Sequence, residues 1–328
     1  TSMLRTLLAA TLAIAATSGA AFADPLPSWI DGAAKQRIIA FVDGVTDPDT
    51  DTYVTPDDRI AVFDNDGTLW AEQPVYFQFL FALDRLKEMA ADDPSVLSSD
   101  LLKAAAAGDM ETVAAAGDEG LLEIVSMTHS GLSTDAFKAE ARAWLDTARH
   151  PTTGMAFDHM VYQPMLELLA YLRDEGFDTY IVSGGGIDFI RAFSEAAYNI
   201  PPEQVVGSAA NASYAVVDGT PTVMKEPGLF FLDDKAGKPV AIESRLGKRP
   251  IIAGGNSDGD FEMLEWTTAG EGPRLGLIVH HTDGDREFAY DRDSHVGRLV
   301  RGLDEAPGRG WLLVDMKSDW ETVWPGGD

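Results

Sequence analysis

The sequence predicts an α/β fold in which a doubly wound parallel sheet carries an inserted α-helical domain. Two observations support this fold class. Short apolar runs alternate with helical segments between residues 161 and 280, which is typical of a parallel sheet with crossover helices. A long stretch with helical spacing, residues 76–150, separates this alternation from the first central strand, Ile60–Phe63. With 328 residues and 45% hydrophobic content, the chain can bury a large core and fold as two lobes.

The individual elements are expected from local patterns. A helix around residues 32–42 precedes the first strand, and apolar side chains such as Phe77, Leu80 and Leu83 then recur at helical spacing. The remaining predicted elements are helices at 161–175, 187–197 and 261–267, strands at 179–182, 250–253 and 275–280, and short β-like runs with turn signals within 205–231.

Two carboxylates follow the first strand directly, in the segment Asp64-Asn65-Asp66-Gly67-Thr68. A strand directs alternate side chains to one face, so Asp64 and Asp66 can approach one reacting centre if the chain stays extended. One carboxylate can then attack while the other transfers protons. Gly67 allows the backbone to turn sharply after them.

A calcium-binding loop begins with a similar pattern and is the alternative interpretation. Such a loop needs a preceding helix, a further acidic ligand before the glycine and a Glu at its twelfth position. Ile60–Phe63 indicates a strand instead, and the twelfth position counted from Asp64 is Val75. The pattern therefore favours a catalytic carboxylate pair.

A glycine-rich turn, Ser183-Gly184-Gly185-Gly186, links the predicted strand at 179–182 to the next helix. Its hydroxyl and free backbone amides, at a helix N-terminus, are suited to bind an anion. Taken alone, the turn could equally be structural.

Hard oxygen ligands follow the predicted strand at 250–253, in residues 254–264. Asn256, Asp258 and Asp260 lie in this segment and suit Mg²⁺, although a solvated acidic turn is the alternative. Ligands of open α/β sheets bind beyond the carboxyl ends of the strands, where all these motifs are expected. His280 and His281 end another predicted strand, where packing is favoured over a metal role.

These motifs, in this order, resemble those of the haloacid dehalogenase superfamily, in particular its phosphoserine-phosphatase-like members with a helical cap. Residues 64–69 resemble the first motif, D-x-D-G-T-[LV], and Ser183-Gly184 the second. Residues 254–264 resemble the fourth motif, with Asn256 in place of its usual first Asp and Asp260 as its second. The resemblance covers residues 60 to about 279 and implies the superfamily's Rossmann-like core.

The resemblance implies roles for the motif residues. Asp64 would be the nucleophile that forms an aspartyl-phosphate, and Asp66 would be the general acid/base, with its backbone carbonyl on Mg²⁺. Ser183 and Gly184 would bind phosphate. The implied Mg²⁺ ligands are Asp64, Asp66, Asn256 and Asp260, and the role of Asp258 is open.

The superfamily also uses one lysine to hold the phosphate. Lys225, Lys235 and Lys238 precede the fourth motif. Lys238 is favoured because Lys238-Pro239-Val240-Ala241-Ile242 resembles K-x-x-x-[LI] at the start of a helix. Its ammonium would reduce the repulsion between the phosphate and Asp64.

The resemblance further implies two domains. Residues 24–72 and 152–328 would form the catalytic core. Residues 73–151 would form a helical cap that closes over the core and selects the substrate.

The formal net charge of −28 restricts the partners of the chain. Nucleic acid and an anionic membrane surface are not expected to bind such an acidic protein. A small phosphate ester needs a metal ion and a lysine close by, and salt screens the longer-range repulsion beyond about 10 Å at 0.1 M. The acidity mildly favours zwitterionic or cationic esters. Cys is absent, which excludes thiol catalysis and thiolate metal sites.

We therefore expect an exported, Mg²⁺-dependent phosphomonoesterase that hydrolyses small phosphate esters through an aspartyl-phosphate. Asp66 argues against a haloacid dehalogenase, which resembles this fold but lacks the second Asp. One alternative is a phosphomutase of the same superfamily. The other is a non-enzymatic protein that binds metal or phosphate, for which Asn256 is the only support.

The N-terminus predicts export. Residues 3–23 have the pattern of a secretory signal peptide: Arg5 gives the positive end, residues 7–16 the apolar core, and Ala21-Phe22-Ala23 the cleavage site. Thr1 and Ser2 precede the expected initiator Met3 and are interpreted as added residues. The mature protein is then expected to be periplasmic or secreted, with no membrane attachment.

Cleavage after Ala23 gives a testable prediction. N-terminal sequencing of the exported protein should start at Asp24. Recovery of a chain that still begins at Met3 from the soluble periplasmic fraction would contradict it.

Overall fold

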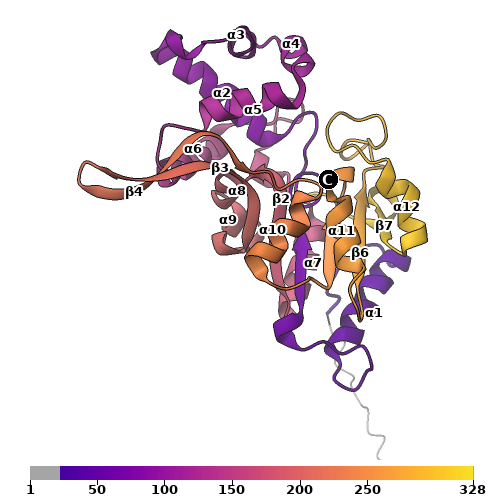
Figure 1. Cartoon of the computed structure of the whole chain (residues 1–328). Helices are drawn as coiled ribbons and strands as arrows, with labels where there is room; N and C mark the ends of the chain where they lie inside the picture. The colour runs from indigo at the N-terminus through magenta and orange to yellow at the C-terminus, as the bar shows by residue number, and fades with distance from the viewer. Residues whose placement is uncertain (1–22, 328) are drawn as a thin grey trace, which may run out of the picture.

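A seven-stranded sheet forms the centre of the molecule (Figure 1). The computed structural model describes residues 23–327, so residues 1–22, which include all of the expected signal peptide except Ala23, lie outside the described part. The strands lie in the order β4-β3-β2-β1-β5-β6-β7, and every neighbouring pair is parallel except β3 and β4. The strands are β1 Ile60–Phe63, β2 Asp178–Gly186, β3 Val205–Val217, β4 Thr220–Phe231, β5 Ile252–Gly255, β6 Leu275–His280 and β7 Leu312–Asp315.

Helices cover both faces of this sheet, which confirms the predicted doubly wound fold class. The covering helices are α1 Ala33–Thr46, α7 Gln163–Asp174, α8 Ile187–Arg191 and α9 Ser194–Tyr198 on one face, and α10 Gly237–Leu246, α11 Phe261–Thr268 and α12 Arg301–Arg309 on the other. Short helices complete the chain: η1 Pro56–Asp58, η2 Pro94–Val96, η3 Phe157–His159, η4 Pro202–Gln204, η5 Asp258–Asp260 and α13 Met316–Asp319.

The central strand β1 contributes side chains to two hydrophobic cores, one on each face of the sheet. All four of its residues are buried, and alternate side chains of a strand point to opposite faces. Ala61 and Phe63 join the larger core under α1 and α7, whereas Ile60 and Val62 join the core under α10 and α11. Burial on both faces explains the uninterrupted apolar run of this strand.

The predicted helix at 187–197 is instead two short helices, α8 and α9. The break falls at Ala192 and Phe193, and Phe193 leaves helical geometry with a φ of −137°. Its ring is buried and stacks on Trp70, with ring centroids 4.3 Å apart. Packing of this aromatic pair has overridden the local helical preference.

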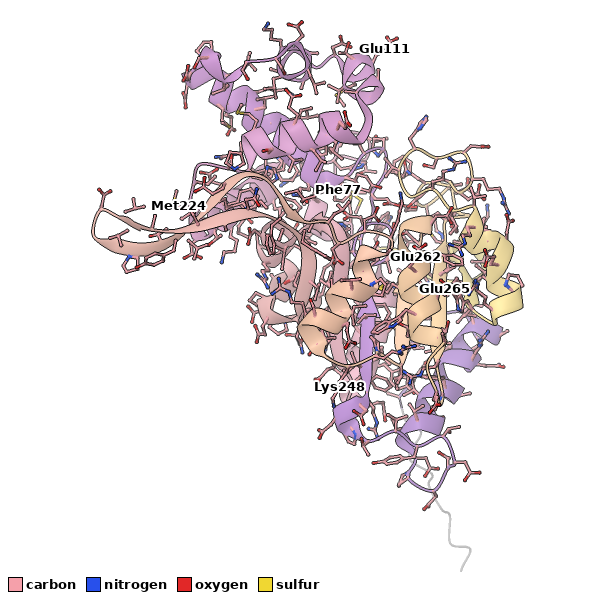
Figure 2. All side chains as sticks on the ribbon, in the orientation of Figure 1. Phe77, Glu111, Met224, Lys248, Glu262 and Glu265 are labelled. Carbon is pink, nitrogen blue, oxygen red and sulfur yellow. The ribbon has the colours of Figure 1, made fainter. Side chains whose placement is uncertain are left out.

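The β-like runs predicted within 205–231 form one long hairpin, β3–β4, which projects from the edge of the sheet (Figures 1 and 2). Asp218 and Gly219 connect the two strands, with φ values of 51° and 82°. Two successive positive φ values give the turn whose twist matches paired strands.

Five helices lie above the carboxyl ends of the strands, as the helical stretch 76–150 predicted (Figure 1). They are α2 Phe77–Asp92, α3 Asp100–Ala107, α4 Met110–Ala115, α5 Gly117–Thr128 and α6 Thr134–Thr147. We call them the helical cap. Four of them, α2 to α5, share a small core of their own, to which α2 contributes Phe79 and Leu83. Helix α6 instead buries Phe137, Ala141 and Leu145 in the larger core of the sheet. The domain limits at residues 73 and 151 remain a prediction.

The cap is attached to the rest of the molecule by packing into the larger core and by pairing with the hairpin. Phe77 and Phe81 of α2 belong to the larger core of the sheet, and Figure 2 shows Phe77 well below the cap's outer end near Glu111. The hairpin forms the second attachment: the Gly131 amide donates to the Lys225 carbonyl and the Lys225 amide to the Leu132 carbonyl, each at 2.9 Å. Within residues 23–327, no helix is long and apolar enough to cross a membrane.

The close packing of β5 against β1 gives a prediction about stability. A Cβ atom added at Gly254 would lie 2.6 Å from Cδ1 of Phe63, a contact too short for real atoms. Gly254→Ala should therefore destabilise the fold by about 1–3 kcal/mol and lower Tm.

Gly308→Ala is the matched control, because a Cβ atom there meets nothing within 4 Å. In helix α12 this change should leave stability unchanged or raise it by up to about 1 kcal/mol. Equal values of Tm for Gly254→Ala and the parent protein, measured by thermal unfolding, would show that β1 and β5 are not packed as described.

Candidate active site

The carboxyl ends of β1, β2 and β5 bring the predicted motifs together. Strand β1 lies between β2 and β5, so the segments that follow the three strands meet at one edge of the sheet. The Asp64 amide donates to the Gly254 carbonyl at 2.9 Å, which continues the β1–β5 pairing into the motif. Asp64 therefore leaves the sheet with its backbone still held in register.

Lys238, at the start of α10, lies at the centre of this cluster. Its ammonium donates to Asp64 Oδ1 at 2.7 Å, to Asp260 Oδ1 at 2.6 Å and to the Val182 carbonyl at 2.9 Å. Only 2% of the side chain is exposed, and lysine is rarely so buried unless it is paired. Burial alone would lower the pKa of Lys238, but the carboxylates of Asp260, Asp64 and Asp233 raise it above the usual value.

The other candidate lysines lie elsewhere. Lys225, on β4, forms a buried ion pair with Asp188 of α8. Lys235 is exposed and adopts a positive φ of 50° in the loop before α10. Of the three, Lys238 is the one that contacts the first and fourth motifs.

The carboxylates of Asp64, Asp66 and Glu72 all lie in this enclosed site, close to the single ammonium of Lys238. Burial, and then repulsion from Asp260, raises the pKa of Asp64 well above its usual value. Burial also raises the pKa of Asp66, and burial followed by repulsion from Asp66 raises the pKa of Glu72. A bound cation would lower all three pKa values, because opposite charge favours the ionised carboxylate.

Asp66 is positioned by an aromatic side chain. The indole Nε1 of Trp70 donates to Asp66 Oδ1 at 2.8 Å. Trp70 itself is fully buried and packs edge-on against Phe77 of the cap, with ring centroids 4.9 Å apart. The orientation of Asp66 is thereby linked to the place where the cap joins the core.

Gly67 has no room for a side chain. Its φ is 77°, and a Cβ atom would lie 2.0 Å from Nδ2 of Asn256 and 2.4 Å from Oε1 of Glu72. Its carbonyl accepts a hydrogen bond from Nε2 of His281 at 2.7 Å, which fixes the turn after Asp66. His281 therefore acts within the loop scaffold, as the packing interpretation expected.

Asn256 follows β5 and faces Glu72. Its Nδ2 donates to Glu72 Oε1 at 2.7 Å, and its Oδ1 accepts from the Thr68 hydroxyl at 3.2 Å. Tyr290 donates a further hydrogen bond to the same oxygen of Glu72, at 2.8 Å. The neutral amide of Asn256 thus contacts the buried carboxylate of Glu72, which belongs to the loop after β1.

Asp260 positions its neighbours. Its Oδ1 accepts from Lys238, and its Oδ2 accepts from the backbone amides of Asn256 and Ser257 at 2.9 and 3.0 Å. Its place among the Mg²⁺ ligands remains a prediction. Asp258, whose role was open, accepts from the backbone amides of residues 300–302 at the start of α12 and is a helix-capping residue.

Ser183 and Gly184 lie in the last part of β2, beyond its final pairing with β1 at Phe63 and Ile181. The strand continues to Gly186, so the glycine-rich segment predicted as a turn is the end of β2. The Ser183 hydroxyl is buried and accepts from the Gly185 amide at 3.0 Å. The Gly184 carbonyl accepts from the Ser208 hydroxyl at 2.8 Å. The glycine-rich segment lines the same cavity as Asp64 and Lys238, where an anion could be bound.

The donor set fits Mg²⁺. Within residues 23–327, no three His, Cys, Asp or Glu side chains are arranged to hold a metal ion by themselves. Mg²⁺ does not need such a cage, because it binds through one or two carboxylates, substrate phosphate and several waters. Asp64, the Asp66 carbonyl and the Asn256 amide oxygen supply hard donors, and a cation bound beside them would favour the ionised forms of Asp64 and Glu72, whose pKa values burial raises.

Sequence reasoning did not identify Glu72 and Asp233 as site residues. Glu72 lies eight residues after Asp64, outside the motifs that carry the family resemblance. Asp233 comes just before Lys238 and is buried. The acidic pair Asp233-Asp234 followed by two lysines was the available signal.

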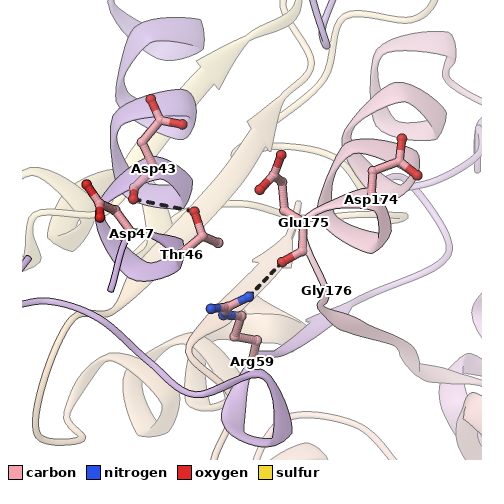
Figure 3. Close-up of a pocket in the computed structure, with 7 residues that line it drawn as sticks. All are labelled: Asp43, Thr46, Asp47, Arg59, Asp174, Glu175 and Gly176. Carbon is pink, nitrogen blue, oxygen red and sulfur yellow. Dashed lines mark hydrogen bonds between the residues drawn. The ribbon is translucent and has the colours of Figure 1, made fainter. Parts of the chain in front are cut away.

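A second hollow lies at the opposite end of β1 (Figure 3). Four carboxylates surround it, and Arg59 donates to the Glu175 carbonyl at 3.0 Å. The predicted motifs do not reach this hollow, because Arg59 precedes β1 whereas Asp64 follows it.

Comparison with known families gives one match. A family model described as haloacid dehalogenase-like hydrolase matches residues 61–265, which include Asp64, Ser183, Lys238 and Asp260. No curated protein matches the chain.

Several solved structures are similar in part. A protein of unknown function from Anaerococcus prevotii is 17% identical, with a TM-score of 0.49, and the match covers 76% of this chain and 86% of that one. A phosphoserine phosphohydrolase-like protein from Francisella tularensis is 16% identical, with a TM-score of 0.41 and coverage of 76% and 98%. A probable phosphoserine phosphatase from Vibrio cholerae is 14% identical, with a TM-score of 0.37 and coverage of 74% and 64%.

Asp233 gives a prediction for the pH dependence of stability. Burial raises its pKa from 3.8 to about 7 in the folded protein. Between about pH 4 and pH 7 the folded protein therefore holds a proton that the unfolded chain has released, so stability falls as pH rises. Asp233→Asn should make this fall smaller in thermal unfolding measured in EDTA.

The exposed Asp57 provides the control, since Asp57→Asn should leave the pH dependence of Tm as it is in the parent protein. An unchanged slope in Asp233→Asn would mean that Asp233 is already ionised throughout this range.

Proposed function

Since the chain belongs to the haloacid dehalogenase-like hydrolase family, we propose that it is a Mg²⁺-dependent phosphomonoesterase. The observation that carries the proposal is the contact between Lys238 and Asp64 at 2.7 Å, with Asp66 two residues along the same loop. A nucleophilic carboxylate, a second carboxylate and a phosphate-binding cation then surround one point. These are the groups that phosphoryl transfer requires.

The proposed reaction has two steps. In the first, Asp64 attacks phosphorus in line, the bond to the leaving oxygen breaks, and Asp66 gives its proton to that oxygen. In the second, Asp66 takes a proton from water, the water attacks phosphorus, and Asp64 is released with inorganic phosphate. The raised pKa of Asp66 suits it to hold the proton needed in the first step.

Positive charge must balance the phosphoryl oxygens throughout. When bound, Mg²⁺ supplies electrostatic stabilisation of the transferring group. Lys238 supplies a fixed ammonium, and Ser183 with the amides of the glycine-rich segment supplies hydrogen-bond donors. Before substrate binds, Lys238 also favours the ionised form of Asp64 by direct contact.

Export remains part of the proposal. The signal-peptide pattern of residues 3–23 and the net charge of −28 support a protein that works outside the cytoplasm on small esters. A compartment poor in sugar bisphosphates makes a phosphomutase the weaker alternative. The buried Asp64–Lys238 pair beside Asp66 argues against a purely non-enzymatic role.

The metal requirement is the first prediction for function. Purified protein should release phosphate from para-nitrophenyl phosphate with Mg²⁺ and lose this activity after dialysis against EDTA, with recovery when Mg²⁺ returns. Full activity in excess EDTA would refute the metal assignment.

The two aspartates should differ in effect. Asp64→Asn should abolish turnover, because an amide is a poor nucleophile towards phosphorus. Asp66→Asn should slow turnover by about 10²- to 10⁴-fold, more for alkyl than for nitrophenyl esters at the first step, because nitrophenolate leaves without a proton.

Steady-state and rapid-quench kinetics on both ester types separate these effects. The Asp66→Asn variant should accumulate phosphorylated enzyme, because water still needs a base in the second step. Asp64→Asn with turnover like that of the parent protein would exclude the proposed nucleophile.

A further inference from the structure

The catalytic groups line a cavity of about 510 Å³ that continues under the helical cap. Asp64, Asp66 and Lys238 line it together with residues of α2, α5 and the hairpin. Cavities of a few hundred Å³ take whole small molecules rather than a phosphoryl group alone. The part under the cap therefore has space for the leaving group of an ester.

Apolar side chains from the cap and the hairpin form a large part of the cavity wall, beside the polar residues Ser126, Lys225 and Glu226. Phe79 of α2, Leu121, Leu122 and Val125 of α5, Phe137 of α6 and Leu229 of β4 all line the cavity. Leu122 and Leu229 are 42% and 40% exposed, which is unusual for leucine. His129 also lines the cavity but is uncharged near neutral pH, because burial lowers its pKa to about 3. Apolar side chains left uncovered beside a reacting centre indicate a surface that a ligand covers.

The charges in the cavity wall disfavour a second anionic group. Lys225 is already paired with Asp188, with its ammonium 4.7 Å from the centre of the Phe137 ring. Seven carboxylate side chains line the whole cavity, against two lysines, Lys225 and Lys238. Beyond the phosphoryl group, the wall therefore repels negative charge.

The hairpin holds this wall in place. Its backbone pairs with residues 131 and 132 of the cap, and the Gly228 amide donates to the Ser126 hydroxyl of α5 at 2.9 Å. The apolar residues of the wall thus come from both the cap and strand β4 of the sheet. Figure 1 shows the hairpin beside the cap. Because these contacts hold the cavity wall in place without a ligand, ligand binding should cost little conformational entropy.

We propose that this cavity selects monoesters of apolar alcohols, with the phosphate at Lys238 and the alkyl or aryl group between α2, α5 and β4. The inference rests on the proposed phosphatase function and specifies its substrate class. Esters that carry a second phosphate or a carboxylate are poor substrates.

A chain-length series tests the proposal. Phosphate release from ethyl, butyl and hexyl phosphate is measured with Mg²⁺. Each buried methylene is worth up to about fourfold, so kcat/KM should rise by on the order of tenfold or more from ethyl to hexyl phosphate. Hexane-1,6-diyl bisphosphate, with the same chain and a second phosphate, should be turned over less well than hexyl phosphate.

Variants of two exposed leucines test whether the chain-length preference arises at the apolar wall of the cavity. Leu122→Asp and Leu229→Asp, at exposed positions, should lower kcat/KM for hexyl phosphate more than for ethyl phosphate and so reduce the preference for the longer chain. Met110→Asp is the matched control, since Met110 is also 40% exposed in the cap but does not line the cavity. A preference that survives in both leucine variants would overturn the proposed location.

Binding measured without turnover separates the two proposals. Calorimetry should show tighter binding of hexylphosphonate than of ethylphosphonate, and the leucine variants should reduce the difference. If no ester is hydrolysed but this difference is found, the phosphatase function fails and the apolar cavity stands. If ethyl phosphate is hydrolysed and neither turnover nor binding depends on chain length, the apolar cavity is refuted and the phosphatase function stands.

Discussion

The buried ammonium of Lys238 is the constraint on which the site depends. It lies between Asp64 and Asp260 and also binds the Val182 carbonyl, so it joins the ends of β1, β2 and β5. Removing one partner of such a buried group leaves an uncompensated charge, which is strongly destabilising. The loops that carry the motifs are therefore arranged around a charge that the fold must neutralise. In the proposed function, that same charge would bind the phosphoryl group of the substrate.

A second set of contacts couples the chemistry to the cap. Trp70 donates to Asp66 and packs against Phe77 at the base of the cap, while Phe193 stacks on its other side. Rigid aromatic packing limits how far Asp66 can turn. Glu72 adds a polar contact from the same segment, through Asn256 and Tyr290. The segment between β1 and α2 thus serves both the reacting groups and the attachment of the cap.

Sequence patterns were enough for strands β1, β2, β5 and β6 and for the motifs that follow them, whereas the edge strand β7 was not predicted. An apolar run followed directly by Asp64 could be located because a strand buried on both faces has a recognisable composition. The split of the helix at 187–197 was not predictable, because it depends on Phe193 meeting Trp70, which is distant in sequence. Glu72, His281 and Tyr290 were likewise not assigned roles from the sequence, since their roles arise from contacts between loops. No local pattern reports that His281 binds the Gly67 carbonyl. Lys238 could be favoured over Lys225 by its local pattern, but its burial between two carboxylates is a tertiary feature.

The central claim is that Asp64 carries the phosphoryl group. The most direct measurement is borohydride trapping during turnover, followed by peptide mass spectrometry, because borohydride reduces an acyl phosphate to an alcohol. The account predicts homoserine at position 64, only when ester and Mg²⁺ are both present, and none in Asp64→Asn. Reduction at another aspartate, or phosphate found on Ser183, would contradict it.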